Sequence, residues 1–570
     1  MASLQPYRSG GKRYYRLVES YRDENSRPKI RLLRHLGTAD NLLRMLTEGP
    51  GRALYAETRE FGAVAALWDI AAEIDLVGTI DRHVEKRDQG ATVGQYMLLA
   101  TVNRTVAPTS KRRLASWYSG TILARLLSLR RGSLRSQRFW DHMKYLDAEK
   151  LLAVERELTS RIVEKYNLNL GALFYDATNF DTFLSSENPS RLAKRGHAKS
   201  KRTDLRIIGL ALMVSSDFHV PLFSRIYEGN KADSVTFSEV LDDLVARYQI
   251  FRERCRKITL VFDKGNNSED NIKELDGSPY HFIGSLVPTQ HQDLLSIPLE
   301  QFRYMPGSRF KGVRVYRTEK EVFGKTRTIV ITRSQPLLRG QVRGIHQHLT
   351  KKIAALQLLQ KKLETSYQPG WSGKPYTREG LEKAAAQIVS GQYVNEFLWA
   401  KVTKRASRLH LKFGKDASSY RSLKRRVLGK RILFTDNAGF TNEEIISGYR
   451  GQYHVEQAFK DMKDPYFVGF SPNHHWTDQM IRVHGFYCVM ALTLSCLLHR
   501  KVDHLGVDLS KTAMLRELQG IKEINNYYPP QSADPLAGGR PRSETTMTKM
   551  NPVQEKLFRG LALSKFVKNR

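Results

Sequence analysis

The sequence predicts an α/β core, a mixed sheet with flanking helices, that is interrupted by an α+β insertion and preceded by a helical domain and a small β-hairpin. The 570 residues are several times the usual domain length, so two to four domains are expected. From residue 168 the apolar runs follow the order strand, strand, strand, helix, strand, helix, strand. A mixed α/β sheet is the natural solution to that order.

The chain is strongly basic, which favours a polyanionic partner. Lysine and arginine number 92 against 58 aspartates and glutamates, a formal net charge of +34. Nucleic acid is the first candidate for that partner, and a merely solubilising basic surface is the alternative. Hydrophobic residues make up 41% of the chain, so the protein as a whole is predicted to be folded around real cores.

Cysteine usage and hydropathy predict a cytoplasmic protein without membrane contact. The three cysteines form no C-x-x-C pair, so the sequence supports neither a disulfide framework nor a zinc ribbon. No signal-peptide apolar region follows the N-terminus. The longest apolar run, Phe486 to Leu498, is too short to span a bilayer, and a buried helix is expected there.

Composition and periodicity divide the chain into five regions. We expect a small basic β-hairpin region at 1–50, a helical DNA-binding domain at 51–165, the catalytic α/β domain at 166–289 and 431–500, an insertion subdomain at 290–430, and a C-terminal helix with a flexible tail at 501–570.

In the N-terminal third, the sequence predicts short helices with basic residues between them. Apolar residues from Phe61 onward follow helical spacing. Thr92 is placed to cap a helix that runs to Val106, and Ser136 opens another helix. Several short helices with basic connections suit DNA docking, although a plain helical bundle fits the same pattern. The predicted DNA contacts in this region are Lys111, Arg112 and Arg113.

Two aspartates follow strand-like runs. Asp176 lies in F-Y-D-A-T-N-F-D, and Asp263 lies in L-V-F-D-K-G-N-N-S, where glycine and asparagine suit a tight exit turn. A buried strand that ends on an aspartate places the carboxylate at the edge of a sheet, where loops leave room for a ligand. Taken separately, each aspartate is also compatible with an ordinary turn or cap residue.

The third carboxylate, Glu456, lies in Y-R-G-Q-Y-H-V-E-Q-A-F-K-D-M-K, which is expected to be part of one helix that opens at Asn442. At about 100° per residue, Tyr449, Gln452, Glu456 and Lys463 fall on one polar stripe beside an apolar stripe. The helix can therefore bury one stripe on the sheet and present the other to a site. An ordinary amphipathic helix with an exposed glutamate is the alternative.

Three carboxylates on rigid elements suit a magnesium site. Mg²⁺ prefers oxygen ligands and keeps several waters. Two such ions about 4 Å apart can activate a nucleophile and stabilise the leaving oxygen in phosphodiester chemistry. The cations around such a site would neutralise DNA phosphates without competing for the metal. The sequence therefore predicts metal-dependent cutting and joining of DNA.

These motifs resemble the DDE transposases of bacterial insertion sequences, and in particular the group with a Y-(2)-R-(3)-E-(6)-K signature. Tyr449, Glu456 and Lys463 match that signature, whereas Gln452 stands in the place of its arginine. Y-D-A-T-N-F resembles the first-aspartate motif and F-D-K-G the second. The basic segment Arg195 to Arg206 is similar to the one that follows the first aspartate in this family, and residues 290–430 supply its insertion.

The resemblance implies an RNase H-like catalytic fold and a cut-and-paste DNA transposase. Asp176, Asp263 and Glu456 would be the catalytic and metal-binding residues, with two Mg²⁺ ions for which Mn²⁺ can substitute. The partners would be double-stranded DNA, namely the terminal inverted repeats and the target, and a second copy of the chain. A bacterial, nucleoid-associated location in the cytoplasm follows. The expected DNA contacts in this part of the chain are Tyr449, Arg450, Lys460, Lys463, Arg195, Lys199, Lys201 and Arg202.

Two other functions remain compatible with the sequence. A structure-selective nuclease of the same fold would cut without strand transfer, and a transposase-derived DNA-binding protein would be catalytically silent. Three further side chains have a possible functional role: His197 and His454 as metal ligands or proton shuttles, and Trp476 as a stacking group. His197 and His454 are more often structural, and Trp476 could stack on a displaced base, although burial against the helix that contains Phe486 is the expected state.

Overall fold

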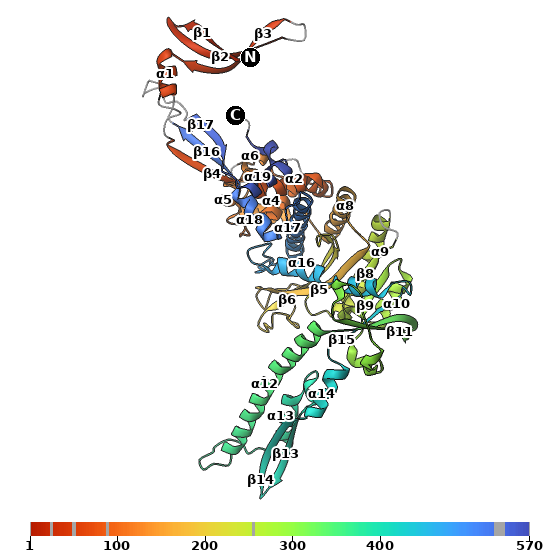
Figure 1. The fold of residues 1–570 in the computed structure, drawn as a ribbon. Helices are drawn as coiled ribbons and strands as arrows, with labels where there is room; N and C mark the ends of the chain where they lie inside the picture. Colours follow the sequence, from red (N-terminus) through yellow and green to blue (C-terminus); the bar gives the residue numbers. More distant parts are fainter. Residues whose placement is uncertain are drawn as a thin grey trace. The chain divides into compact units, whose positions relative to one another are not determined.

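The computed structural model of the protein describes residues 2–22, 27–47, 53–86, 90–130, 132–252, 257–528 and 542–568. The chain forms two compact units (Figure 1). The first unit comprises residues 1–68, 113–130 and 501–570, and the second comprises 69–112 and 131–500. The candidate site lies in the second unit.

A three-stranded antiparallel sheet begins the first unit. The strands β1 (Ala2–Ser9), β2 (Lys12–Arg22) and β3 (Pro28–Gly37) pair in the order β1-β2-β3, and α1 (Ala39–Thr47) follows. The predicted hairpin lacked one strand of this sheet. Residues Ala2 to Ser9 form that strand and pair with Glu19 to Lys12. Residues 23–26 of the expected turn lie outside the described residues.

A second sheet joins the N-terminal and C-terminal segments of this unit. Here β4 (Tyr55–Glu60) pairs with β16 (Lys522–Tyr528), which pairs with β17 (Arg542–Met547). In the chain, the helix α18 (Lys511–Gly520) precedes β16 and the helix α19 (Pro552–Gly560) follows β17. Within the expected flexible tail, residues 542–547 pair in the sheet, 552–560 form α19 and 563–566 form a 3₁₀ helix. Residues 529–541, also part of that expected tail, lie outside the described residues.

The predicted helical character of 51–165 is confirmed, with β4 as an added strand. Thr92 caps α4 as expected: its hydroxyl accepts from the backbone N–H of Gln95, and the Gln95 side chain accepts from the backbone of Thr92. The helices are α2 (Gly62–Glu73), α3 (Leu76–Arg82), α4 (Val93–Val106), α5 (Leu114–Ser119), α6 (Leu123–Leu127), α7 (Ser136–Met143) and α8 (Ala148–Tyr166).

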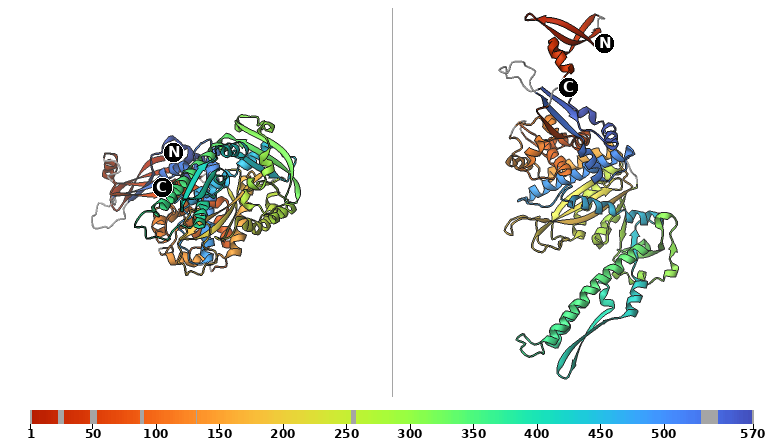
Figure 2. Two further views of the ribbon diagram at one scale, coloured as in Figure 1. Left: turned by 90° about the horizontal axis from the view of Figure 1, so that it is seen from below. Right: turned by 60° about the vertical axis from the view of Figure 1, so that its left-hand side comes forward.

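A nine-stranded mixed sheet forms the centre of the second unit. Some of its strands are drawn in yellow in the right-hand view of Figure 2. Its strand order is β10-β11-β12-β15-β9-β8-β5-β6-β7. β5, β6 and β7 are antiparallel neighbours, whereas β8 is parallel to β5 and β9 is parallel to β8. The five-strand part has the order third, second, first, fourth, fifth, so the predicted RNase H-like α/β core is confirmed. Its elements are β5 (Ala172–Thr182), β6 (Arg206–Ser215), β7 (Pro221–Glu228), α9 (Asp233–Arg252), β8 (Thr259–Val261), α10 (Glu269–Gly277) and β9 (His281–Ser285).

The sheet extends into the predicted insertion. β10 (Arg303–Tyr304), β11 (Val313–Val322) and β12 (Lys325–Ser334) continue it, and β15 (Lys430–Thr435) links β12 to β9. Residues 327–331 of β12 are all buried, which is the pattern of a central strand covered on both faces. The first 45 residues of the expected insertion thus contribute strands to the core sheet instead of a separate subdomain, counting from 290 to the last residue of β12 at 334 (334 − 290 + 1 = 45).

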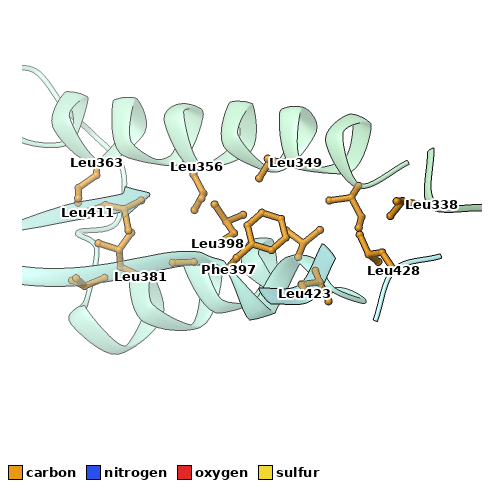
Figure 3. Packing of buried hydrophobic residues seen from close by; sticks show 14 residues of the cluster. Leu338, Leu349, Leu356, Leu363, Leu381, Phe397, Leu398, Leu411, Leu423 and Leu428 are labelled. Atoms are coloured by element: carbon orange, nitrogen blue, oxygen red, sulfur yellow. The ribbon is translucent and has the colours of Figure 1, made fainter. Parts of the chain in front are cut away.

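Between β12 and β15 the chain forms a subdomain with its own hydrophobic core (Figure 3). The long helix α12 (Gln335–Thr365) and the shorter α13 (Arg378–Val389) enclose the hairpin of β13 (Leu398–Arg405) and β14 (Arg408–Lys415), and α14 (Ala417–Arg426) follows. Leu356, Leu363 and Leu381 are fully or almost fully buried in this core. Burial of these apolar side chains stabilises the subdomain.

Three helices complete the second unit. They are α15 (Asn442–Arg450), α16 (Tyr453–Lys463), which packs on β5 and β6, and α17 (Asp478–His504). α17 is long and apolar enough to cross a membrane, so the argument from run length was wrong, but 94% of its most apolar window is buried inside the protein. The expected buried helix is confirmed. Cys488 and Cys496 are buried, and Cys255 lies outside the described residues.

Candidate active site

A cavity of about 590 Å³ brings the three predicted carboxylates together. Asp176 from β5, Asp263 from the turn after β8 and Glu456 from α16 all line it. The cavity is also lined by Leu337 and Tyr393 of the subdomain between β12 and β15. The convergence joins segments separated by up to 280 residues, since 456 − 176 = 280.

Strand register explains why the two aspartates are neighbours. β5 and β8 are parallel, and Phe174 pairs with Val261. Asp176 and Asp263 each come two residues after these partners, on adjacent strands that are about 4.8 Å apart. The expectation that Asp176 ends its strand was wrong, because β5 continues to Thr182 through its pairing with β6. β8 does end before Asp263, as expected.

The environment of Asp176 disfavours its charged form. Burial, opposed by the nearby charge of Lys199, raises the pKa of the Asp176 carboxyl from 3.8 to about 6. Asp263 and Asp233 contribute like charges that raise it further. Lys199 is fixed beside the strand, since its ammonium donates to the carbonyl oxygen of Ala177 at 2.6 Å. A divalent cation would offset this unfavourable ionisation.

Asp263 has the opposite environment. Burial favours its neutral form, but hydrogen bonds from Tyr449 and Ser285, with the backbone N–H and charge of Lys264, hold the pKa of Asp263 below its usual value. The hydroxyl of Tyr449 donates to Oδ1 at 2.7 Å and that of Ser285 donates to the same oxygen at 3.0 Å. Asp263 is therefore a charged carboxylate with a fixed orientation.

Tyr449 is a positioning residue in this geometry. The residue is 6% exposed, and the guanidinium of Arg431 lies 4.9 Å from its ring centroid. Burial and the charge of Asp263 raise the pKa of Tyr449, so the phenol stays protonated and continues to donate. The hydroxyl of Tyr449 is directed to Asp263, and its predicted contact with the DNA backbone stays a prediction.

The signature segment is two helices instead of one. α15 ends at Arg450 and α16 begins at Tyr453. A Cβ on Gly451, which lies between them, would approach the ring of Phe174 to 2.3 Å, so the chain passes against β5 where only glycine fits. The expectation of one continuous helix through this segment is therefore wrong, and both Arg450 and Gln452 line the cavity.

The other predicted DNA contacts of the second unit differ in their exposure and in their hydrogen-bond partners. Lys463 is exposed, and its ammonium donates to the Thr178 hydroxyl at 2.8 Å on the strand of Asp176. Arg450 donates to the carbonyl oxygen of Arg309 and lies 5.2 Å from the ring centroid of Phe310. Lys460, Arg195, Lys199, Lys201 and Arg202 are exposed, and Arg202 forms an ion pair with Asp204.

Lys111, another predicted DNA contact, is held by hydrogen bonds inside the fold. Its ammonium donates to Nε2 of His475 at 2.9 Å and to the hydroxyl of Tyr487 at 3.1 Å, within a group of aromatic rings. Burial, with the nearby charge of Arg104, lowers the pKa of Lys111 to about 7. Lys111 is thus a half-buried cation held among aromatic rings, whereas Arg112 and Arg113 are exposed, and the DNA contacts predicted for all three stay predictions.

The donor set suits hard divalent cations. Carboxylate oxygens are the ligands that Mg²⁺ prefers, and a magnesium site needs only one or two protein carboxylates, with waters and substrate phosphate oxygens as the other ligands. Within the described ranges, no group of three or more His, Cys, Asp or Glu side chains is close enough to hold one ion. The residues therefore fit ions that are each held by one or two carboxylates, and do not fit a three-carboxylate cage.

Sequence reasoning missed several residues of this cavity. Ser285 ends β9 next to β8, and the F-D-K-G motif contained Lys264, which was not selected. Arg431 is the second residue of β15, the strand that returns from the subdomain. Ser285 and Arg431 have no local sequence signal, because their proximity to the carboxylates depends on pairing across the sheet. Only Lys264, adjacent to Asp263, carried a usable sequence signal.

Comparison with known proteins assigns the chain to a family. Residues 5–60 match the IS1634 family transposase N-terminal domain, and residues 170–494 match the transposase DDE domain. No curated protein matches the chain. One solved structure, the cryo-EM structure of a piggyBac transposase synaptic complex with hairpin DNA, is 10% identical, with 80% of this chain and 79% of that chain covered and a TM-score of 0.36, too low to support an argument. Because the DDE match spans more than half of the sequence and contains all three cavity carboxylates, the chain belongs to the DDE transposases and is a DNA transposase.

Proposed function

We propose that Asp176, Asp263 and Glu456 are the catalytic carboxylates of a cut-and-paste transposase that cleaves transposon ends and joins them to target DNA. The observation that carries this proposal is the cavity that all three line, with Asp176 and Asp263 in matched register on adjacent parallel strands. In the first step a water oxygen attacks phosphorus and the 3′-oxygen leaves, which generates a free 3′-hydroxyl. In the second step that hydroxyl attacks a target phosphodiester and displaces another 3′-oxygen.

DDE transposases use divalent metal ions, and we infer two Mg²⁺ ions for this chain, with Mn²⁺ as a substitute. Asp176 and Asp263 would hold one ion, and Asp176 with Glu456 the other. When bound, the ions would activate the attacking oxygen and stabilise the leaving one. The different environments of the two aspartates support this arrangement. Hydrogen bonds keep the carboxylate of Asp263 charged, whereas the charged form of Asp176 is disfavoured without a bound cation.

The chain's own residues would orient the acids and the DNA. Tyr449 and Ser285 fix the carboxylate of Asp263. Lys264, Arg431 and Arg450 line the same cavity as the acids and supply positive charge to phosphate oxygens. Cations beside a scissile phosphate position the backbone and carry no sequence information.

The segment Tyr449 to Lys463 supports membership of the Y-(2)-R-(3)-E-(6)-K group, with one exchange. Gln452 occupies the arginine position and lines the cavity. Its side-chain nitrogen is buried and has no hydrogen-bond partner among the residues that the structure describes. A buried donor without a partner is costly, so we infer that a DNA oxygen accepts this hydrogen bond. Arg450, on the same cavity wall, would supply the charge that Gln452 lacks.

The partners would be double-stranded transposon ends and target DNA, and the active form a homodimer on DNA, because two ends must be handled together. A nucleoid-associated location in the cytoplasm would follow. The net charge of +34 supports the DNA partner. The exposed cations Lys199, Lys460 and Lys463, which flank β5 and α16, are the residues we expect nearest to the cut.

An oligonucleotide assay tests this function. The substrate carries the inverted repeats that flank the gene, and cleavage and strand transfer are both measured with Mg²⁺. Asp176→Asn, Asp263→Asn and Glu456→Gln should each abolish both steps while DNA binding persists, and Asp270→Asn, an exposed acid on α10, should retain both. Cleavage without strand transfer would indicate the nuclease alternative, and binding without cleavage by the unmodified protein would indicate the silent one.

A further inference from the structure

We propose that a second cavity in the same unit binds one unpaired nucleotide of a DNA strand, an inference that rests on the proposed function for the identity of the strand. The cavity has a volume of about 630 Å³ and shares no lining residue with the carboxylate cavity. Its volume lies within the range of about 300–1,000 Å³ that is typical of small-molecule sites. Its walls come from the loop after α4, from α7 and from residues 465–476.

The charge of the cavity selects an anion. Arg104, Lys111 and Arg112 line it together with two histidines, and no aspartate or glutamate does. None of the ion pairs found between described residues includes any of these three cations, and Arg104 donates instead to the carbonyl oxygen of Gly469 at 2.8 Å. Cations without a counter-charge in a partly enclosed site favour a bound phosphate.

Lys111 is the most confined of these cations. Its ammonium lies 4.7 Å from the ring centroid of Trp140 and 5.1 Å from that of Phe139, and its hydrogen-bond partners are His475 and Tyr487. Burial lowers the pKa of His475 and of the neighbouring His484 well below the usual value, so both imidazoles stay neutral. The charge on Lys111 is therefore not compensated from within the protein, and a phosphate would compensate it.

Trp476 supplies an aromatic face at the same cavity. We expected this side chain to be buried against α17, but the residue is 66% exposed. Its backbone is nevertheless held, because the side chain of Asn188 donates to the carbonyl oxygen of Trp476 at 3.1 Å. Asn473 accepts from the backbone N–H of His475 at 3.0 Å, which fixes the turn before it. A fixed backbone with an exposed indole is suited to stacking at low conformational cost.

An aromatic face next to uncompensated cations matches the chemistry of one nucleotide. A base stacks on aromatic rings whatever its sequence, and its phosphate binds to the cations. In a paired duplex the bases are stacked on one another and cannot reach a side chain in this way, so the site selects an unpaired nucleotide. Stacking on one aromatic side chain contributes about 1–3 kcal/mol per base.

The test compares two exposed tryptophans in the full-length protein. Binding of a fluorescent single-stranded oligothymidylate and of a blunt duplex is measured by anisotropy for Trp476→Ala and for Trp399→Ala, which is 47% exposed on β13 and serves as the control. Trp476→Ala should weaken binding of the single strand about tenfold and leave the duplex unchanged, and Trp399→Ala should change neither. Equal single-strand affinity of Trp476→Ala and the unmodified protein would overturn the proposal.

A competition experiment checks the ligand class without relying on a buried variant. Thymidine monophosphate, thymidine and inorganic phosphate compete with the oligothymidylate on the unmodified protein and on Arg112→Gln, a change at an exposed position. Thymidine monophosphate should compete best, and Arg112→Gln should weaken its competition with the oligothymidylate. Equal competition by inorganic phosphate would show an anion site without base recognition and contradict the proposal. Asp176→Asn should bind the single strand as the unmodified protein does. Failure of the catalytic proposal would be seen separately, because that variant would then retain cleavage.

Discussion

The hydroxyl of Tyr449 donates a 2.7 Å hydrogen bond to Oδ1 of Asp263. The two residues are 186 positions apart, and the contact links the helix before Glu456 to the strand end that carries the second aspartate. One hydrogen bond therefore connects two of the three segments that form the cavity. It also lowers the pKa of Asp263 against the effect of burial.

Tyr449→Phe should reduce the rate of DNA cleavage by about tenfold, the lower end of what removal of a group that orients a metal ligand usually costs. DNA affinity should stay unchanged, because the hydroxyl faces the protein. Loss of the donor raises the pKa of Asp263, so the acidic limb of the rate profile should shift to higher pH. Gel-shift and cleavage assays over pH 5–8 check this. A weaker DNA affinity with an unshifted profile would instead support direct contact with DNA.

Asp176→Asn should produce an inactive protein that is more stable without metal at neutral pH. The folded-state pKa of Asp176, about 6, lies above the ordinary 3.8, so its ionisation lowers stability by at most about 3 kcal/mol. Because the folded pKa is raised, wild-type stability falls as pH rises from about 4 through 6. The advantage of Asp176→Asn should be complete above pH 6 and absent below pH 4. Denaturant unfolding in EDTA measures it, and an equal advantage at all pH values would exclude ionisation as the cause.

The exposed face of the β13–β14 hairpin should contact DNA phosphate. Lys401 pairs directly with Lys412 across the strands, and Arg405 pairs with Arg408. Like charges in directly opposed positions destabilise a hairpin, and phosphate would relieve that repulsion. Lys401→Gln with Lys412→Gln should weaken DNA binding and reduce the slope of log affinity against log salt by about 1–2.

The control for the hairpin variants is Arg378→Gln with Lys383→Gln on α13, where Arg378 already pairs with Glu382 at 2.9 Å. This control removes the same number of charges from the same subdomain and should change the slope less. If both pairs of substitutions reduced the slope equally, general charge and not the hairpin face would determine the affinity.

Gly451→Ala should reduce both stability and activity. The added Cβ would lie 2.3 Å from the ring of Phe174, and such overpacking typically costs about 1–3 kcal/mol. It would also displace α16 and Glu456 from β5. The double variant with Phe174→Leu, which removes the obstructing ring atoms, should recover activity relative to Gly451→Ala alone. Thermal unfolding and cleavage assays report the two effects, and no recovery in the double variant would contradict the packing explanation.

The sequence predicted the core sheet well because its strands and helices are locally periodic. The order of elements from β5 to β9 followed from apolar runs and turns, and Thr92 was recognised as a cap from its own neighbourhood. The paired aspartates were found because each follows a run of buried residues. These features depend on contacts within a few residues, which a sequence pattern records.

The features that were missed depend on distant contacts. The break at Gly451 arises from packing against Phe174, and no local signal distinguishes that glycine from one inside a helix. The role of Tyr449 follows from its contact with Asp263, and the exposure of Trp476 from the absence of a covering element in the described structure. The extension of the sheet by β10–β12 required β15 to pair with β12 about 100 residues later in the chain, from Thr328 with Thr435 onward (435 − 328 = 107).

Metal binding by Glu456→Gln tests the central claim most directly, since the claim is that Glu456 and Asp176, on different elements, together hold the second of two ions. Mn²⁺ binding to the full-length protein with transposon-end DNA can be followed by electron paramagnetic resonance and compared with the unmodified protein and with Asp270→Asn. The account predicts that Glu456→Gln loses one of two bound ions while DNA remains bound and Asp270→Asn keeps both. Unchanged Mn²⁺ stoichiometry and affinity in Glu456→Gln would contradict it.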